Sequence, residues 1–141
     1  MIRAAKADQM RASGVIAREF QRALNGFRAG VAVAPVTDQI NYDSIYTERY
    51  MGQLKDDEAG YHQSDVTTAA ANLHGALLLV HGTGDDNVHF QNSMQMIDAL
   101  INAGKQFQLM IYPNKTHSIS GSAARDHLFH MIQDHFEKQL K

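Results

Sequence analysis

Hydrophobic positions follow two different patterns along the chain, and the changes between them mark the predicted elements. Three short runs are almost continuously apolar or β-branched: GVAVAPV at 30–36, ALLLVHG at 76–82 and FQLMIYP at 107–113. Runs of this kind, bounded by Gly or Pro, are typical of strands that are buried on both faces of a parallel sheet. The sequence therefore predicts three such strands.

Segments whose apolar residues have helical spacing separate and flank these three runs. In residues 1–25, Ile16, Phe20 and Leu24 recur at intervals of four, which predicts one amphipathic helix. The same spacing, with Ser64 as a cap of the first segment, predicts further helices at 64–73, 90–102 and 122–140. Strands that alternate with helices favour the α/β class, with right-handed crossovers between parallel strands.

Composition narrows the classes of function. The chain has 13 Lys and Arg against 15 Asp and Glu, so its net charge of −2 provides no basic surface and we expect no nucleic acid as a partner. The absence of cysteine excludes disulfides, thiolate catalysis and Cys-based metal sites. The charged N-terminal sequence and the lack of long apolar runs predict no signal peptide and no membrane segment on this chain. The compartment is not indicated, and no cofactor is predicted.

An acidic pair and a histidine follow the second and third predicted strands. Asp85 and Asp86 come after the second strand, and His117 comes after the third. The carboxyl ends of parallel strands meet at one edge of a sheet, and acid before base is the chain order of an α/β-hydrolase triad. In such a triad the carboxylate holds the imidazole in one tautomer while its other nitrogen takes a proton from a hydroxyl. Alternatively, an Asp caps the following helix and His117 is an ordinary surface residue.

Longer strings of sequence point to one family. VAVAPVTD, YDSIYTERYMG, HGTGDDNVHFQ and the final DHFEKQL closely resemble the C-terminal part of the catalytic domain of dipeptidyl peptidase IV-like serine peptidases, in the prolyl oligopeptidase family. The resemblance covers about residues 27–140. It implies an α/β-hydrolase domain joined to a β-propeller, and release of N-terminal dipeptides with proline at the penultimate position.

The resemblance also implies a fold and a division of the chain. We expect a partial α/β-hydrolase fold of about three parallel strands flanked by helices, with an extra N-terminal helix. Residues 1–25 would form an unmatched amphipathic helical segment, and residues 26–141 the C-terminal portion of the peptidase domain.

Seven residues acquire roles from the same resemblance. Asp85 matches the triad acid, His117 the triad base, and Asn87 the residue that binds a substrate carbonyl near the scissile bond. The walls of the pocket for the proline ring are matched by Tyr42, Tyr46, Val36 and Val88. Aromatic faces and aliphatic edges suit a flat apolar ring. The alternative is that the two tyrosines, at i and i+4, are core residues on one helix face.

Other family features are not found in the sequence. No Gly-x-Ser-x-Gly motif occurs, and neither Ser13 nor Ser120 has the strand-turn-helix surroundings of a nucleophile. The tyrosine that donates to the oxyanion and the propeller glutamates are also unmatched, Gln39 replaces a usual aromatic residue, and Ser118 replaces a usual glycine. We therefore expect a truncated form with acid and base but no recognisable nucleophile, inactive by itself. The alternative is a noncatalytic α/β-hydrolase remnant or interaction module.

Partners and metals complete the expectations. If active, the protein would act on a peptide with a penultimate proline. Half of a sheet leaves one strand edge uncovered, so a homo-oligomer, or the N-terminal half of the domain, is expected to cover it unless residues 1–25 do so. The last predicted helix carries His127, His130 and His135, which are interpreted as a solvated face, and no metal site is predicted. Family members are often exported or membrane-anchored.

Overall fold

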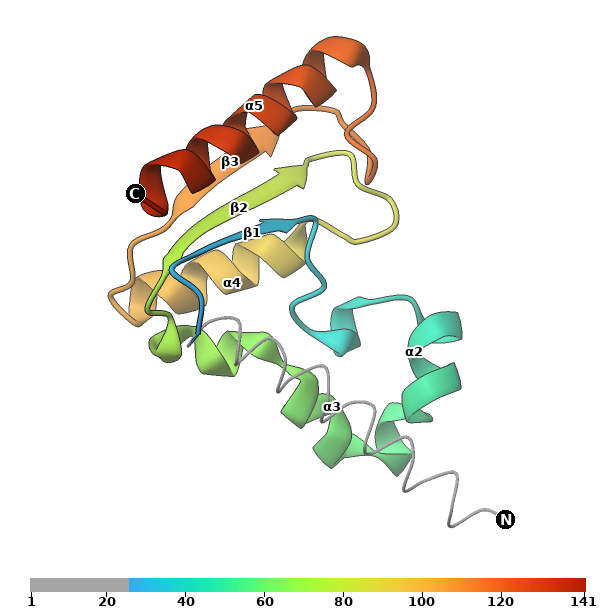
Figure 1. Ribbon diagram of the computed structural model, residues 1–141. Coiled ribbons are helices and arrows are strands. Elements are labelled where there is room, and N and C mark those ends of the chain that lie inside the picture. Colours follow the sequence, from blue (N-terminus) through green and yellow to red (C-terminus); the bar gives the residue numbers. More distant parts are fainter. Residues whose placement is uncertain (1–25) are drawn as a thin grey trace.

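Three parallel strands form the centre of the protein, whose computed structural model describes residues 26–141 (Figure 1). They are β1 (Ala29–Val33), β2 (Ala76–Gly82) and β3 (Gln108–Tyr112), in the order β1-β2-β3. β2 lies in the middle and pairs in parallel with both neighbours. The prediction of an α/β fold with three parallel strands is confirmed. The helix predicted within residues 1–25 lies outside the described residues.

The first strand is shorter than its apolar run. β1 ends at Val33 because Ala34 adopts a positive φ of 46° and Pro35 follows, and neither conformation continues a ladder. The chain leaves the sheet at this point, although the N–H of Ala34 still donates to the carbonyl of Val80 over 2.8 Å. The rest of the apolar run therefore belongs to a loop at the carboxyl edge of the sheet.

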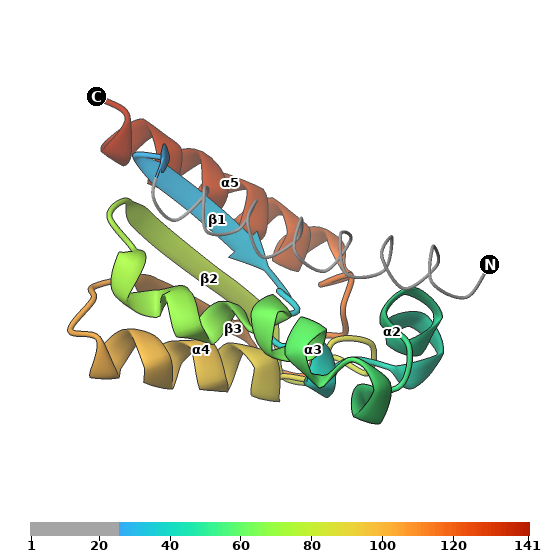
Figure 2. The same cartoon turned by 90° about the horizontal axis from the view of Figure 1, so that it is seen from below.

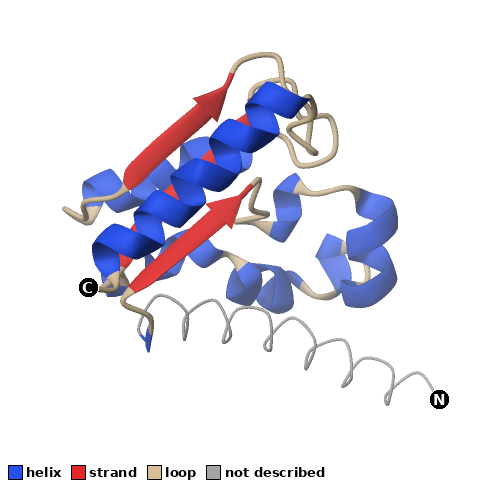
Figure 3. Cartoon of the chain, turned by 45° about the horizontal axis from the view of Figure 1, so that its top comes forward, coloured by secondary structure: helices blue, strands red, loops and turns tan. Residues whose placement is uncertain are grey.

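Helices cover both faces of the sheet (Figures 1 and 2). On one face, α4 (Gln91–Asn102) and the 3-10 helix η3 (Val66–Asn72) pack together and cover Leu77 and Leu79 of β2. On the other face, α5 (Ser122–Gln139) lies over the sheet and runs along the strands, as Figure 3 shows, and Leu128 packs with Leu78 and Val80. Successive residues of β2 point to opposite faces, so one apolar strand supplies both cores.

The connection between β1 and β2 contains the remaining elements. These are η1 (Gln39–Asn41), α2 (Ser44–Met51), η2 (Leu54–Asp56), α3 (Glu58–Ser64) and η3. The helix predicted over 64–73 is present as the shorter 3-10 helix η3, but the prediction that Ser64 is its cap is wrong. Ser64 ends α3, and the cap of η3 is Asp65, whose carboxylate accepts from the N–H of Thr67 over 2.9 Å. A short carboxylate that binds the backbone two residues ahead favours a new turn over continuation of the helix.

Within residues 26–141, no helix combines the length and the hydropathy that a membrane crossing requires.

Candidate active site

The loops that follow β2 and β3 are bonded to each other. The N–H of Thr83 donates to the carbonyl of Tyr112 and the N–H of Gly84 to that of Lys115, each over 3.0 Å. Gly82 lies so close to the Lys115 carbonyl that a β-carbon would collide with it, which makes glycine necessary here. Two loops that are far apart in sequence are thereby held together at the carboxyl edge of the sheet.

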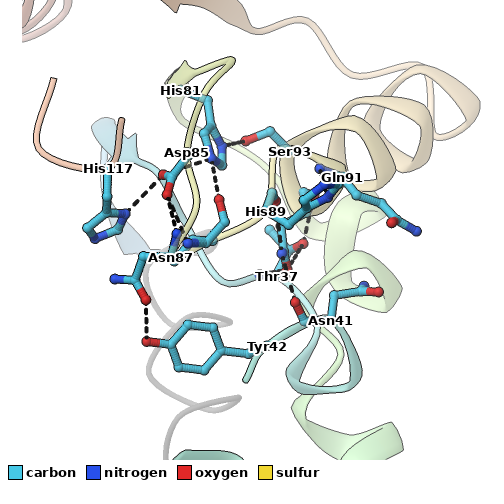
Figure 4. Close-up of polar contacts among 12 residues, drawn as sticks. Thr37, Asn41, Tyr42, His81, Asp85, Asn87, His89, Gln91, Ser93 and His117 are labelled. Atoms are coloured by element: carbon cyan, nitrogen blue, oxygen red, sulfur yellow. Dashed lines mark hydrogen bonds and ion pairs between the residues drawn. The ribbon is translucent and has the colours of Figure 1, made fainter. Parts of the chain in front are cut away.

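Asp85 lies in the first of these loops, and both of its oxygens accept hydrogen bonds (Figure 4). Oδ1 accepts from the backbone N–H groups of Asn87, over 3.0 Å, and Val88, over 2.9 Å. Oδ2 accepts from Nδ1 of His117 over 3.0 Å. The carboxylate does not cap α4, whose N-cap residue is Phe90. These bonds close a turn and leave Oδ2 directed at the imidazole.

The environment of Asp85 keeps its carboxyl group ionised. Burial raises the pKa, since the side chain is 0% exposed. The hydrogen bond from His117, the two backbone N–H groups and the charge of His117 together lower the pKa further than burial raises it. The net pKa of Asp85 lies below its ordinary value. An anion at this position acts only as a hydrogen-bond acceptor.

His117 consequently carries its hydrogen on Nδ1. Because an ionised carboxylate only accepts, Nδ1 must donate, and Nε2 of the neutral ring is left with a lone pair. The side chain is 41% exposed, so a reacting group can reach the ring. Two residues later, Ile119 has a positive φ of 45° and is buried beside Tyr112 and Leu128. A β-branched residue rarely adopts this conformation, and its burial anchors the loop that carries His117.

Asn87 and the two tyrosines form the next part of the site. The hydroxyl of Tyr42 donates to Oδ1 of Asn87 over 3.2 Å. The rings of Tyr42 and Tyr46 meet edge to face, with centroids 5.5 Å apart. Tyr42 precedes α2, and Tyr46 on that helix is 51% exposed, so the alternative of two core residues on one helix face is not what is observed. Tyr46 lines an open depression of about 500 Å³ along α2.

Val36 and Val88 have different surroundings. Val36 is half-buried in the loop after β1, whereas Val88 is 3% exposed and contacts the acid through its backbone N–H. The loop of Val36 is fixed by Thr37, whose N–H donates to Oδ1 of Asn92 over 3.1 Å and whose hydroxyl donates to the Asn92 carbonyl over 2.8 Å. Asn92, at the start of α4, also donates to the His89 carbonyl over 3.1 Å. One buried amide thus connects the loop after β1 to the segment that follows Asp85.

Two histidines to which the sequence analysis gave no role in the site are buried. His81 at the end of β2 is 0% exposed and contacts Asp85, and the only signal in the sequence is the i, i+4 spacing of the two residues. His135 is 2% exposed, and its Nδ1 contacts Oε1 of Gln108 over 3.0 Å. The interpretation of His135 as part of a solvated face is therefore wrong, because that side of α5 faces the sheet. In the described part of the chain, no cluster of three or more His, Asp or Glu residues could hold a metal ion.

Comparisons with known proteins identify the family and the fold. The sequence pattern of the prolyl oligopeptidase family matches residues 16–141. Dipeptidyl peptidase 4 of Bos taurus is 48% identical over 117 residues, which are 80% of this chain and 15% of that protein. Prolyl endopeptidase FAP of Mus musculus is 46% identical over 117 residues, with the same shares of 80% and 15%.

A solved structure shares the fold. The crystal structure of Porphyromonas gingivalis dipeptidyl peptidase 4 superposes with a TM-score of 0.83 at 40% identity, covering 90% of this chain and 18% of that one. The chain spans about 15% of the length of the curated relatives that it matches. The matched range begins at residue 16, and the proposed boundary at residue 25 stays a prediction. On this combination of sequence and fold, the chain belongs to the prolyl oligopeptidase family.

Proposed function

We propose that this chain supplies the acid and the base of a serine-type peptidase site that releases N-terminal dipeptides with a penultimate proline. The observation that carries the proposal is the 3.0 Å bond between Nδ1 of His117 and Oδ2 of the buried Asp85. The names of the relatives, dipeptidyl peptidase 4 and prolyl endopeptidase, support the reaction and the substrate class.

The chemistry follows from the fixed tautomer. With Nδ1–H bonded to Asp85, Nε2 of His117 takes the proton of a nucleophilic hydroxyl as that oxygen attacks the scissile carbonyl. The imidazolium that forms is stabilised by the carboxylate, and it then returns the proton to the leaving amine. Asp85 stays ionised throughout, because its donors hold its pKa low.

Substrate positioning is assigned to the neighbouring residues. Since the hydroxyl of Tyr42 occupies the carbonyl oxygen of Asn87, the amide NH₂ group of Asn87 is oriented to donate to a substrate carbonyl. Tyr42 and Tyr46 present aromatic edges and faces to the proline ring, with Val36 and Val88 as the aliphatic walls. Val88 is 3% exposed, so its part of the proposed wall is buried in this chain.

The nucleophile is assigned to polypeptide beyond these residues. The 141 residues contain no Gly-x-Ser-x-Gly motif, so the proposal takes the serine from another segment of the peptidase. An acid and a base without a nucleophile provide little catalysis, and the chain alone is expected to hydrolyse no peptide efficiently. The alternative, a noncatalytic interaction module, becomes an outcome of the test.

The test joins residues 26–141 to the nucleophile-bearing part of a relative. In the bacterial dipeptidyl peptidase compared above, the superposed segment is replaced by residues 26–141, and hydrolysis of a Gly-Pro chromogenic amide is measured together with serine labelling by a fluorophosphonate. We expect turnover, lowered by about a thousandfold or more in His117→Ala and in Asp85→Asn.

An exposed histidine provides the matched control. His130 lies exposed on α5, and its ring bonds to the carbonyl of Asp126 on the same helix. His130→Ala is expected to retain turnover within about twofold. A chimera that unfolds cooperatively on heating yet shows neither turnover nor labelling favours the noncatalytic module, as does turnover that survives His117→Ala.

A further inference from the structure

A second histidine reaches the carboxylate of Asp85. His81, the penultimate residue of β2, has a side chain that is 0% exposed, and its Nε2 lies 3.2 Å from Oδ2 of Asp85. The same Oδ2 accepts from His117 over 3.0 Å (Figure 4). Two imidazoles thus meet at one carboxylate oxygen, one buried and one partly exposed. The proposed reaction uses only the exposed ring.

The other contacts of His81 determine which of its nitrogens carries a hydrogen. Nε2 lies 2.9 Å from the carbonyl oxygen of Val88, which can only accept, so Nε2 must donate. Nδ1 lies 2.7 Å from the hydroxyl of Ser93 on α4, which can donate to it. The Nε2–H group is therefore bonded to the Val88 carbonyl, and the same nitrogen lies 3.2 Å from Oδ2 of Asp85. The edge of the ring also meets Phe90, with centroids 5.3 Å apart, which fixes its plane.

These contacts make His81 part of the support of the acid. Ser93 on α4 bonds to Nδ1 of His81, and the backbone of His81 belongs to β2. The Nε2–H group is therefore held in a fixed position. In the described part of the chain, the ionisable side chains recorded in contact with Asp85 are His81 from β2 and His117 from the loop after β3. A carboxylate whose Oδ1 is bonded by backbone N–H groups can still pivot at Oδ2, and His81 limits that movement.

We propose that His81 is a positioning residue, which holds Oδ2 of Asp85 in place for His117 through the close approach of its Nε2–H group to that oxygen. The inference rests on the proposed role of the Asp85–His117 pair. Its test requires no turnover, so that its failure can be told apart from failure of the proposed function. Chemically, the assignment distinguishes Nε2, which faces the acid, from Nδ1, which faces Ser93.

Substitution of His81 by Gln or by Asn distinguishes the roles of its two ring nitrogens. The amide nitrogen of His81→Gln falls near the place of Nε2 and can donate to Asp85, whereas that of His81→Asn falls near the place of Nδ1 and can reach only Ser93. Both variants replace a buried ring by a smaller polar side chain. A merely structural role predicts similar effects for both, and the proposed role predicts rescue by Gln alone.

The control is an equivalent substitution at the other buried histidine. His135 is 2% exposed and, like His81, contacts one side chain and one backbone carbonyl, those of Gln108 and Ala76. None of these three residues contacts Asp85 in the described structure. His135→Gln therefore measures the effect of replacing a buried histidine that does not contact Asp85.

The measurement is solvent exchange of the Nδ1–H proton of His117, followed by NMR at pH 7 in the full 141-residue chain with ¹⁵N-labelled histidine. We expect exchange about tenfold faster in His81→Asn, and within about twofold of the parent chain in His81→Gln and His135→Gln. Equal acceleration in the Asn and Gln variants, or no acceleration in either, overturns the proposal.

A second measurement uses the unmodified chain and so does not depend on the variants folding. Long-range ¹H–¹⁵N correlations identify the tautomer of His81. The proposal requires the hydrogen on Nε2, and a ring with its hydrogen on Nδ1 alone overturns it, because such a ring has no donor to offer Asp85.

Discussion

The two parts of the candidate site are built in contrasting ways. Asp85 and His117 extend from the ends of neighbouring strands, in loops that are bonded to each other, and the acid is fully buried. Tyr42 and Tyr46 lie in the long connection between β1 and β2, and the side chain of Tyr46 is half exposed. The proposed proton transfer requires a fixed geometry, which strand ends provide, whereas the side chains proposed as the pocket wall are held less firmly.

The largest expected effect on stability is at the acid. Asp85→Ala removes the acceptor for two backbone N–H groups and for Nδ1 of His117, and donors left unpaired in the interior are costly. We expect the free energy of unfolding to fall by about 3 kcal/mol, as measured by urea denaturation of the chain. Exposed Asp86 is the control, and Asp86→Ala should change it by less than about 0.5 kcal/mol. Equal effects would mean that Asp85 is not held as described.

The next effect tests the connection between the two parts. Asn92→Ala removes the buried amide that accepts from Thr37 and donates to His89, and we expect a loss of about 2 kcal/mol in unfolding free energy. Gln95 on the same helix makes one exposed bond to Asn41, so Gln95→Ala should cost less than about 0.5 kcal/mol. Urea denaturation of both variants measures the difference, and similar losses would contradict a specific role of the buried amide.

Two carboxylates should oppose each other in the pH dependence of stability. The pKa of Asp85 lies below its ordinary 3.8, so its contribution is present above pH 3.8 and is lost as the pH falls through the lower pKa of the folded state. Burial raises the pKa of Asp38 despite its bond from the N–H of Ile40, so its contribution is present below pH 3.8 and is lost as the pH rises through the raised value.

Urea denaturation between pH 5 and about pH 3 measures both contributions. Asp85→Asn is expected to weaken the loss of stability on acidification, and Asp38→Asn is expected to strengthen it. If the two variants change the pH dependence in the same direction, the contrast between the two carboxylates is wrong.

The smallest effect on stability is expected in the aromatic part. Tyr46 is 51% exposed and makes ring contacts with Tyr42 and Tyr50, so Tyr46→Ala should reduce the unfolding free energy by less than about 1 kcal/mol. In the active chimera, the same change should raise KM for the Gly-Pro amide more than it lowers kcat. A fall in kcat with KM unchanged would contradict a role in holding the proline ring.

Local patterns in the sequence were sufficient for the elements that have one strong period. The apolar run of β2 and the helical spacing of α4 and α5 lead directly to the observed elements. The start of the helix predicted over 64–73 was wrong, because the carboxylate of Asp65 accepts from the N–H of Thr67 and begins a separate 3-10 helix. Pro35 was predicted to end the first strand, which ends at Val33 because Ala34 already has a positive φ.

The polar network of the site depends on contacts that no local pattern contains. The place of Asp85 and His117 follows from strand order, but Oδ2 also meets His81, whose position in an apolar run gives no sign of its partner. His135 is buried because its side of α5 faces Gln108 and the sheet, and helical spacing alone assigned it to the solvent. Such pairings arise from how the elements pack, so they become visible only in the folded chain.

The central claim is that Asp85 and His117 form a bonded pair in this chain before any substrate or nucleophile is added. Long-range ¹H–¹⁵N correlations of the labelled chain at pH 7 test it most directly by identifying the tautomer of His117. The account predicts hydrogen on Nδ1, with slow exchange in the parent chain and fast exchange in Asp85→Asn. Hydrogen on Nε2 alone, or exchange that is unchanged by Asp85→Asn, would contradict it.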